Sequence, residues 1–193
     1  MRDSSSPLPE GVAGVLVPES SIGERVRELG RRITVDHAGR ELVLVTVLRG
    51  GVFFLADLCR AIDLPLRLEF MAVSTYVGAP GGHVRVTKDL DGPIEGASVV
   101  VVEDIVDTGL TLNFILGMLA ARGPASLEVC ALLDKDVRRI ADVRIEYRGF
   151  RIPDSFVVGY GLDLAGTLRN LPYVASLDEG VLEATLAARA GNR

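Results

Sequence analysis

A run of four valines at residues 99–102 is followed directly by two acids, Glu103 and Asp104. A short, continuous run of β-branched residues is typical of a strand buried on both faces, as in a parallel sheet. Two adjacent carboxylates at the end of such a strand are costly to bury unless something binds them, and sugar hydroxyls or a divalent cation would do so. The run therefore predicts a buried sheet with a polar ligand at one edge.

The residues that follow form a turn suited to a phosphate. Residues 107–111, of sequence DTGLT, stand between the strand and an apolar stretch at residues 112–121 that predicts a helix. Gly109 permits a tight backbone and the close approach of a ligand, and the two threonines offer hydroxyl donors. The free N–H groups and the dipole at the start of a helix favour an anion there. An acidic pair beside an anion cradle suits one ligand that carries both sugar hydroxyls and a phosphate.

Elsewhere the chain alternates strands with helices. A capping box of Ser21 and Glu24 opens a helix expected at residues 21–38, and a second helix is expected at 52–62. The other expected β segments are 42–48, 66–72, 127–133, and shorter pieces near 143–147 and 156–160. This alternation predicts right-handed βαβ units around a mainly parallel sheet. Ligands of such sheets sit at the carboxyl ends of strands, where the acidic pair and the Arg49-Gly50-Gly51 turn would meet.

Length and composition predict one domain. The chain has 193 residues, 48% hydrophobic and 24% charged, so it can bury a core without disulfides or a metal. We expect a domain at residues 13–185 between a frayed tail at 1–12 and a frayed C-terminus at 186–193. Residues 75–87 are rich in glycine, and we expect a long loop there that serves as a lid over a site.

Charge and hydropathy exclude several function classes. A net charge of −5 disfavours a general affinity for nucleic acid, and the longest uncharged apolar run, residues 108–121, is too short to span a membrane. The Ser- and Pro-rich beginning does not resemble a secretory signal, and Cys59 and Cys130 are expected to be reduced, buried thiols, so the sequence predicts a cytoplasmic protein. No Cys–His cluster has zinc spacing, and His37 and His83 are expected on the surface.

Residues 99–112 resemble the phosphoribosyl-pyrophosphate signature of the type I phosphoribosyltransferases. The resemblance extends in family order over residues 15–180, and its other motifs match the 6-oxopurine branch, the hypoxanthine-guanine phosphoribosyltransferases. These motifs are VLRGG at residues 47–51, STY at 74–76, KDL at 88–90, LLDK at 132–135 and IPDSFVVGYGLD at 152–163.

The resemblance implies an α/β fold, with a mainly parallel central sheet flanked by helices and a small hood built from the terminal segments. It implies purine salvage, in which the 5-phosphoribosyl group passes from phosphoribosyl pyrophosphate to N9 of hypoxanthine or guanine, giving IMP or GMP and diphosphate. It also implies Mg²⁺ as the cofactor and a homodimer or homotetramer. The sequence does not rank hypoxanthine, guanine and xanthine.

The resemblance assigns roles to residues of this chain. Asp107 would be the general base that takes the proton from N7 of the purine. The ribose and 5′-phosphate would be bound by Glu103, Asp104, Asp107, Thr108, Gly109, Leu110 and Thr111. Diphosphate would be bound by Arg49, Gly50 and Arg169, and magnesium by Glu103, Asp104 and Asp163. The purine would contact Ile105, Lys135, Phe156, Val157 and Asp163.

Two of the implied roles have a direct physical reason. Lys135 would donate to the 6-oxo oxygen of the purine, so adenine, which presents an amino group there, would leave the lysine unpaired. A lid that includes Thr75 and Tyr76 would close over the site and exclude water.

Five positions depart from the pattern of the family. They are Arg49 in place of lysine, Val77 in place of glycine, Asp136 in place of proline, and Leu164 and Leu168 in place of aromatic residues. Two other functions stay open. A sensor that binds the sugar donor without turnover would use the same scaffold, and a dimeric aspartic protease would use the Asp-Thr-Gly at 107–109 but requires an all-β chain, against the helices expected here.

Overall fold

The computed structural model describes residues 8–76 and 83–190, apart from the side chains of Thr75, Tyr76, His83, Leu186, Arg189 and Ala190. The chain forms two compact units. The larger unit is Gly23–Asp154, and the terminal unit combines the segments Met1–Ile22 and Ser155–Arg193.

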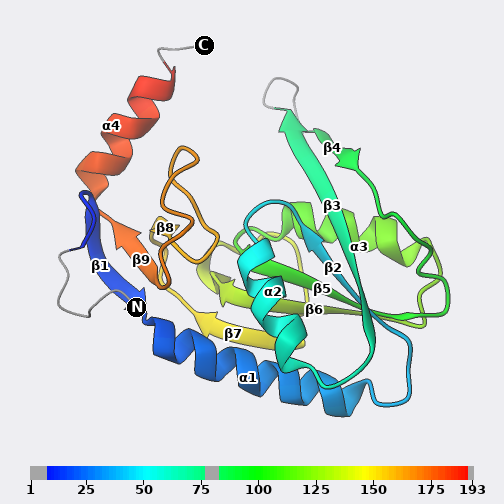
Figure 1. Ribbon diagram of the computed structural model, residues 1–193. Helices are drawn as coiled ribbons and strands as arrows, with labels where there is room; N and C mark the ends of the chain where they lie inside the picture. Colours follow the sequence, from blue (N-terminus) through cyan, green and yellow to red (C-terminus); the bar gives the residue numbers. More distant parts are fainter. Residues whose placement is uncertain (1–7, 77–82, 191–193) are drawn as a thin grey trace. The chain divides into compact units, whose positions relative to one another are not determined.

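The larger unit is built on a six-stranded sheet (Figure 1). Its strands are β2 (Leu42–Val47), β3 (Leu66–Tyr76), β4 (His83–Lys88), β5 (Ser98–Val106), β6 (Ser126–Asp134) and β7 (Tyr147–Arg151). The order across the sheet is β4-β3-β2-β5-β6-β7, with β4 antiparallel to β3 and every other pair parallel. The first five residues of both β2 and β5 are buried, which is why these strands are continuous apolar runs in the sequence. The expected mainly parallel sheet is confirmed.

Helices α2 (Val52–Ala61) and α3 (Leu110–Ala120) cover opposite faces of this sheet (Figure 1). The connection β2-α2-β3 runs one way along the sheet and β5-α3-β6 runs the other way. Right-handed crossovers in opposite directions place their helices on opposite faces. On the α3 side, the apolar cluster includes Leu112, Ile115 and Leu119 of the helix and Val43, Val45, Val99 and Val101 of the sheet.

The reversal of direction leaves β2 and β5 as neighbours whose connections diverge. In an open α/β sheet, this is the switch point where the loops at the carboxyl ends separate and leave room for a ligand. The Arg49-Gly50 turn follows β2, and residues 103–111 occupy the end of β5 and the start of α3. The sheet order therefore brings together two segments that are more than fifty residues apart in sequence.

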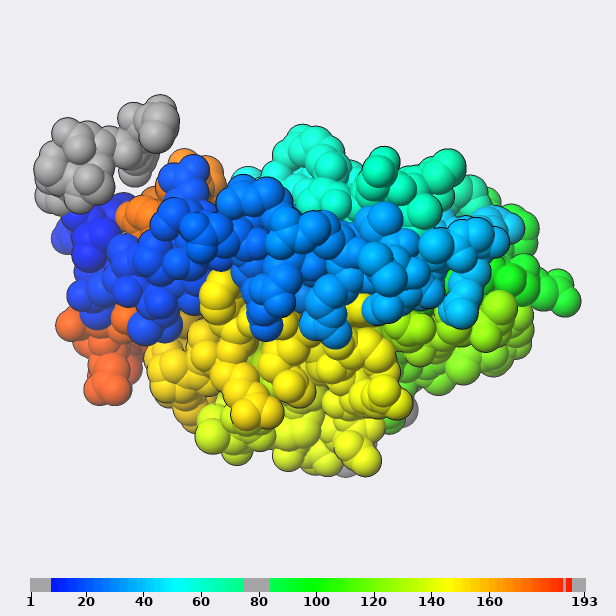
Figure 2. Space-filling view, turned by 90° about the horizontal axis from the view of Figure 1, so that it is seen from below, coloured from blue at the N-terminus to red at the C-terminus, as the bar shows by residue number. Residues whose placement is uncertain are grey.

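Helix α1 (Glu19–Asp36) contributes its residues from Gly23 onward to the larger unit. Arg25 donates from Nε to the Gly149 carbonyl at 3.1 Å and from Nη2 to the Arg148 carbonyl at 2.9 Å. Figure 2 shows the blue surface of this helix beside the yellow surface of the chain around β7. No helix within the described ranges is both long and apolar enough to cross a membrane.

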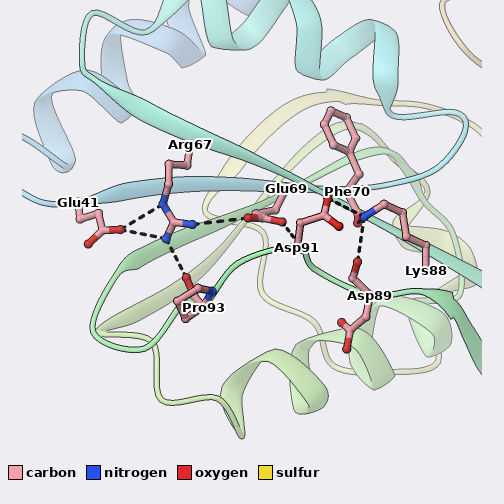
Figure 3. Close-up of polar contacts among 8 residues, drawn as sticks. All are labelled: Glu41, Arg67, Glu69, Phe70, Lys88, Asp89, Asp91 and Pro93. Atoms are coloured by element: carbon pink, nitrogen blue, oxygen red, sulfur yellow. Dashed lines mark hydrogen bonds and ion pairs between the residues drawn. The ribbon is translucent and has the colours of Figure 1, made fainter.

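A polar network fastens the connection between β4 and β5 to β3 (Figure 3). Arg67 of β3 donates to Glu41 at 2.9 Å and to the Pro93 carbonyl at 2.8 Å. Lys88 Nζ donates to the Phe70 carbonyl at 3.2 Å. These groups are partly exposed, so each contact contributes only about 0–1 kcal/mol. Together they fix the path by which the chain enters β5.

The terminal unit holds a three-stranded antiparallel sheet in the order β1-β9-β8. Its elements are β1 (Val12–Val17), β8 (Val157–Val158), β9 (Val174–Leu177) and α4 (Glu179–Ala190). The apolar cluster of this unit consists of Val158, Leu164, Leu171, Ala175 and Leu177. Its construction from both ends of the chain confirms the expected hood. The domain limits expected at residues 12 and 185 stay a prediction.

Several local expectations were wrong. Helix α1 begins at Glu19, and the Ile22 N–H donates to the Pro18 carbonyl at 3.0 Å, so Ser21 lies inside the helix and is not its N-cap. The helix ends at Asp36 rather than at residue 38. The strand expected near 143–147 begins only at Tyr147 and runs to Arg151.

The ends of the Gly-rich stretch are strands rather than loop. Strand β3 continues to Tyr76 and β4 begins at His83, and the two pair as a hairpin; residues 77–82 lie outside the described part. His37 was expected on the surface but is fully buried, with Nε2 at 3.2 Å from the hydroxyl of Tyr147. Both cysteines are free thiols; Cys130 is buried and Cys59 is half-buried.

Candidate active site

A cavity of about 210 Å³ opens at the carboxyl ends of β2 and β5. Its lining residues are Val47, Glu103, Ile105, Val106, Asp107, Thr108, Gly109, Thr111 and Leu112. Most of the residues predicted to hold ribose and phosphate therefore share one cavity. The apolar members come from both strands and from the first turn of α3, so the polar groups stand against a largely apolar wall.

The acidic pair lies inside β5 and not after it, because the strand continues to Val106. Alternation along the strand separates the pair, so that Glu103 lines the cavity and Asp104 lies against the turn after β2. Burial, and after it the charge of Asp104, raises the pKa of Glu103 well above its usual range. A cation or a set of hydroxyl donors at this position would relieve that cost.

Asp104 joins the acidic pair to the turn expected to bind diphosphate. Its Oδ1 accepts the N–H of Ile105 at 2.8 Å. A Cβ on Gly50 would lie 1.6 Å from Asp104 Oδ2, so only glycine lets the backbone approach the carboxylate this closely. Arg49 beside it is exposed, and the Leu48–Arg49 peptide bond is cis. The two segments are in contact, as the sheet order requires.

The expected phosphate cradle is the beginning of α3. Gly109 stands at the N-cap with a φ of +77°, a conformation that favours glycine. Its carbonyl accepts the N–H of Asn113 at 2.8 Å, and the Thr108 hydroxyl accepts the N–H of Leu110 at 3.4 Å. N–H groups in a first helical turn have no carbonyl within the helix to bond, and the helix dipole favours an anion beside them. Thr111 lines the cavity, whereas the side chain of Leu110 is exposed.

Asp107 lies between the acidic pair and the cradle. Its Oδ2 is 3.5 Å from Nη1 of Arg138, while its Oδ1 is buried and has no hydrogen-bond partner among the described residues. A buried carboxylate oxygen without a donor is unfavourable, and it is well placed to accept a proton or a hydrogen bond from a ligand. The side chain also lines the cavity.

Lys135 follows the last residue of β6 and is only 6% exposed. Its backbone N–H donates to the Val106 carbonyl at 2.9 Å, so it lies beside the strand end that carries the acidic pair. Its ammonium is 3.9 Å from Asp154 Oδ1, a long contact for a buried cation. A buried ammonium needs acceptors, and a ligand carbonyl would provide one.

The other expected site residues belong to the terminal unit. Phe156 has 39% of its surface exposed, and Val157 is buried in β8. Arg169 pairs with Asp163 at 2.5 Å and donates to the Gly161 carbonyl at 2.6 Å. Phe156 therefore presents an aromatic surface, and Asp163 and Arg169 are held together as a pair.

Comparison with known proteins gives a consistent family. A family model described as the phosphoribosyl transferase domain matches residues 19–164. The hypoxanthine phosphoribosyltransferase of Salmonella typhimurium is 47% identical over 167 residues, 84% of this chain and 94% of that protein. The hypoxanthine-guanine phosphoribosyltransferase of Mycobacterium avium is 47% identical over 183 residues, 91% of this chain and 90% of that protein. The chain belongs to the hypoxanthine-guanine phosphoribosyltransferases.

Solved structures agree with this assignment. A hypoxanthine phosphoribosyltransferase from Staphylococcus aureus matches with a TM-score of 0.88 at 42% identity, covering 93% of this chain and 98% of that chain. The enzyme from Trypanosoma cruzi, in complex with its product IMP, matches with a TM-score of 0.86 at 40% identity, covering 91% and 100%. Hypoxanthine-guanine phosphoribosyltransferases are purine-salvage enzymes that form IMP or GMP from phosphoribosyl pyrophosphate. The sensor and protease hypotheses are therefore set aside.

The structure describes four of the five residues that depart from the phosphoribosyltransferase pattern. Leu164 belongs to the apolar cluster of the terminal unit and Leu168 packs against it, so aliphatic side chains fill these positions and the pair of Asp163 and Arg169 is still formed. Asp136 is exposed. Val77 lies outside the described residues.

The expected lid residues are the last two of β3. Their Cα partners are Val84 for Thr75 and His83 for Tyr76 in the neighbouring β4. The side chains of Thr75 and Tyr76 lie outside the described ones. Their role as a lid stays a prediction.

The carboxylates of the larger unit fit a magnesium ion that is shared with a substrate. Within the described ranges, no three His, Cys, Asp or Glu residues form a ready-made metal site. Carboxylates are hard oxygen ligands of the kind that Mg²⁺ prefers, so Glu103 and Asp104 are the residues that would bind such an ion, and Mg²⁺ commonly takes its other ligands from water and substrate phosphates. Burial and the charge of Asp104 raise the pKa of Glu103, so the negative charge of this carboxylate is unfavourable unless a cation or a hydrogen-bond donor is bound.

Sequence reasoning missed three polar residues around the site. Thr46 of β2 donates to the Val102 carbonyl at 2.7 Å and ties the two strand ends together. Arg138 contacts Asp107, and Arg139 pairs with Asp134. A threonine within the apolar run LVLVTV was a visible signal, whereas the arginine contacts depend on the path of the chain after β6.

Proposed function

We propose that the cavity between β2 and β5 binds phosphoribosyl pyrophosphate, and that Asp107 is the general base of the transfer reaction. The observation that carries the proposal is that Asp107 lines the cavity while its buried Oδ1 lacks a hydrogen-bond partner among the described residues. Residues 107–111 hold the 5′-phosphate at the start of α3, and Glu103 and Asp104 bind the ribose hydroxyls.

In the proposed reaction, the bond between C1′ and the diphosphate oxygen breaks while the bond between C1′ and N9 of the purine forms. Diphosphate leaves with the electron pair, and the proton on N7 passes to Asp107. Positive charge develops on the ribose, so the carboxylates of residues 103, 104 and 107 favour the transition state. This accounts for a cluster of acids in a site whose donor substrate is itself anionic.

The diphosphate would be bound by the backbone at Gly50 and by Arg49 and Arg169. Bound Mg²⁺, held by Glu103, Asp104 and Asp163, would offset the charge of the diphosphate oxygens. Arginine in place of the lysine that is usual at position 49 keeps the positive charge and adds a planar fork of donors that suits phosphate oxygens. The contact between Gly50 and Asp104 supports a shared site for diphosphate and ribose.

The purine would be recognised by Lys135, which donates to its 6-oxo oxygen, while Ile105 and Phe156 contact its faces. The backbone of Val157 would read the edge of the base, and Asp163 would lie near it. The burial of Lys135 and the exposed surface of Phe156 support these roles. Adenine would be rejected because its amino group leaves Lys135 unpaired.

We further propose that the enzyme is a homodimer or homotetramer in the cytoplasm, that it binds neither nucleic acid nor membranes, and that Thr75 and Tyr76 close over the bound substrates. The two free thiols suit a reducing compartment. The net charge of −5 disfavours polyanionic partners.

A base panel tests the proposal. The purified protein is incubated with phosphoribosyl pyrophosphate and hypoxanthine, guanine, xanthine or adenine, with and without Mg²⁺, and nucleotide formation is followed by chromatography. We expect IMP and GMP in the presence of Mg²⁺ and no AMP. Xanthine is included because its ranking is open. AMP formed as fast as IMP would contradict the role of Lys135, and equal rates without Mg²⁺ would contradict the role of the metal.

A further inference from the structure

The carboxylate of Asp134, the last residue of β6, is almost completely buried and is flanked by two guanidinium groups. Arg139 contacts it through Nη2, and Arg148 lies with Nε 2.6 Å from its other oxygen. Only 1% of Asp134 is exposed. A buried carboxylate is tolerated when it is paired in this way. The cluster directly precedes Lys135, the residue proposed to recognise the purine.

Arg139 extends from this cluster to the phosphate cradle. Its Nη2 is also 3.5 Å from the Val106 carbonyl, the acceptor of the Lys135 N–H. Its Cδ lies 3.2 Å from the place a Cβ would take on Gly109, so the arginine packs directly behind the N-cap of α3.

The chain after Arg139 continues along the cradle. The N–H groups of Ile140 and Ala141 both donate to the Thr108 carbonyl, at 2.9 and 3.0 Å. Thr108 is thus held from behind while its other side borders the cavity. One segment therefore contacts the strand end that presents Lys135 and the turn that is proposed to hold the 5′-phosphate.

We propose that Arg139 is a positioning residue that fixes the spacing between the purine-recognition end of β6 and the phosphate cradle. The nucleotide product spans these two sites, so an error in their spacing weakens binding at one end whenever the other end is occupied. This inference rests on the proposed function of the cradle and of Lys135. Arg139 acts through its contacts with Asp134, Val106 and Gly109 and does not itself touch a substrate.

A simpler role would be to neutralise Asp134 and stabilise the fold. Arg148 offers the matched control, because it pairs with the same carboxylate but lies on β7, on the far side of β6 from β5 and the cradle. Arg148→Gln removes one guanidinium from Asp134 without removing a contact to Val106 or Gly109. Arg139→Gln removes both kinds of contact.

The experiment measures the KM of each substrate, kcat, the dissociation constant of IMP and the melting temperature for Arg139→Gln, Arg139→Lys and Arg148→Gln. We expect Arg139→Gln to lower kcat/KM and to weaken IMP binding by about tenfold or more. Arg139→Lys keeps a charge beside Asp134, but its single ammonium lacks the fork that reaches two acceptors, so it stays impaired. Arg148→Gln should lower the melting temperature while changing kcat/KM by less than about threefold.

Equal effects of Arg139→Gln and Arg148→Gln on kcat/KM would overturn the proposal, as would a loss of stability in Arg139→Gln without a change in kcat/KM. If Arg139→Gln does not fold, the kinetics of Arg139→Lys decide, and wild-type kinetics in that variant would contradict a positioning role.

A Thr111→Val variant distinguishes a failure of this inference from a failure of the proposed function. An unchanged KM for phosphoribosyl pyrophosphate in Thr111→Val overturns the cradle and the inference together, whereas a raised KM with normal Arg139 variants overturns the inference alone.

Discussion

Glu103 carries a charge that is unfavourable in the free protein, and we propose that it binds the ribose hydroxyls of the substrate. Burial raises its pKa, so the protonated form is favoured in the folded state relative to the unfolded chain. The stabilisation that this provides is complete below the ordinary pKa of a glutamate and is lost as pH rises through the raised folded-state value. At neutral pH the site therefore reduces stability, as active sites commonly do.

The first prediction follows from the raised pKa of Glu103, which makes its charged form destabilising. Glu103→Gln should stabilise the protein without ligands by about 0.5–2 kcal/mol at pH 8, and the difference should shrink toward pH 4. Thermal melting of both proteins across this pH range checks it. Glu95→Gln, a change of an exposed acid shortly before β5, is the control and should have little effect. A Glu103→Gln variant that melts at or below the wild-type temperature at pH 8 would contradict the account.

The second prediction concerns Gly50. A methyl group at Gly50 would overlap Asp104 Oδ2, so Gly50→Ala must displace the carboxylate or the turn. We expect the KM for phosphoribosyl pyrophosphate to rise by about tenfold or more. Gly117→Ala, in α3 where the added methyl meets open space, should leave the KM unchanged. Steady-state kinetics of both variants test this, and an unchanged KM in Gly50→Ala would contradict the close contact.

At the scale of elements, five were predicted because local apolar patterns in the sequence indicate which of their residues are buried. These elements are strands β2, β5 and β6 and helices α2 and α3. Strand β1 was missed because only Val17 of its six residues is buried, and its partner β9 lies about 160 residues away. The start of α1 was misplaced because Ser21 and Glu24 match a capping box, whereas the helix begins at Glu19 and the Pro18 carbonyl accepts the N–H of Ile22. Local sequence patterns do not predict which distant strands pair, and they do not fix the residue at which a helix begins.

The third prediction concerns the end of β6. Lys135→Met removes the donor to the 6-oxo oxygen, so kcat/KM for hypoxanthine should fall by about 100-fold, and the ratio of hypoxanthine to adenine activity should fall with it. Lys88→Met is the matched control, because Lys88 donates to the Phe70 carbonyl in the network of Figure 3. That change should leave the ratio unaltered. The two ratios are measured with both bases, and a normal ratio in Lys135→Met would exclude Lys135 from base recognition.

At the scale of the whole molecule, the candidate residues are divided between the two units. The residues proposed for phosphate, ribose and the 6-oxo group lie in the larger unit, around the switch point between β2 and β5. Phe156, Val157, Asp163 and Arg169 lie in the terminal unit. The sheet and the cradle could be argued from residues alone. The residues of the terminal unit could not, because Phe156 or Arg169 taken singly resembles an ordinary core or surface residue, and only the order of motifs along the chain singled them out.

The contacts that the sequence could not predict are those between residues that only the path of the chain brings together. The ion pair of Arg138 with Asp107 and the contact of Arg139 with Asp134 both depend on how residues 136–141 turn back toward β5. No periodicity predicts such a path. His37 is a similar case, since it is buried and contacts Tyr147, which lies more than a hundred residues away in sequence.

The central claim is that Asp107 accepts the proton from the purine during transfer, and the most direct measurement is the kinetics of Asp107→Asn beside wild type, with the exposed Asp142→Asn as the control. Asparagine keeps the size of the side chain but is a poor proton acceptor. We predict that kcat falls by about 10²–10⁴-fold while the KM of both substrates stays within a few-fold, and that Asp142→Asn behaves as wild type. A wild-type kcat in Asp107→Asn would contradict the account.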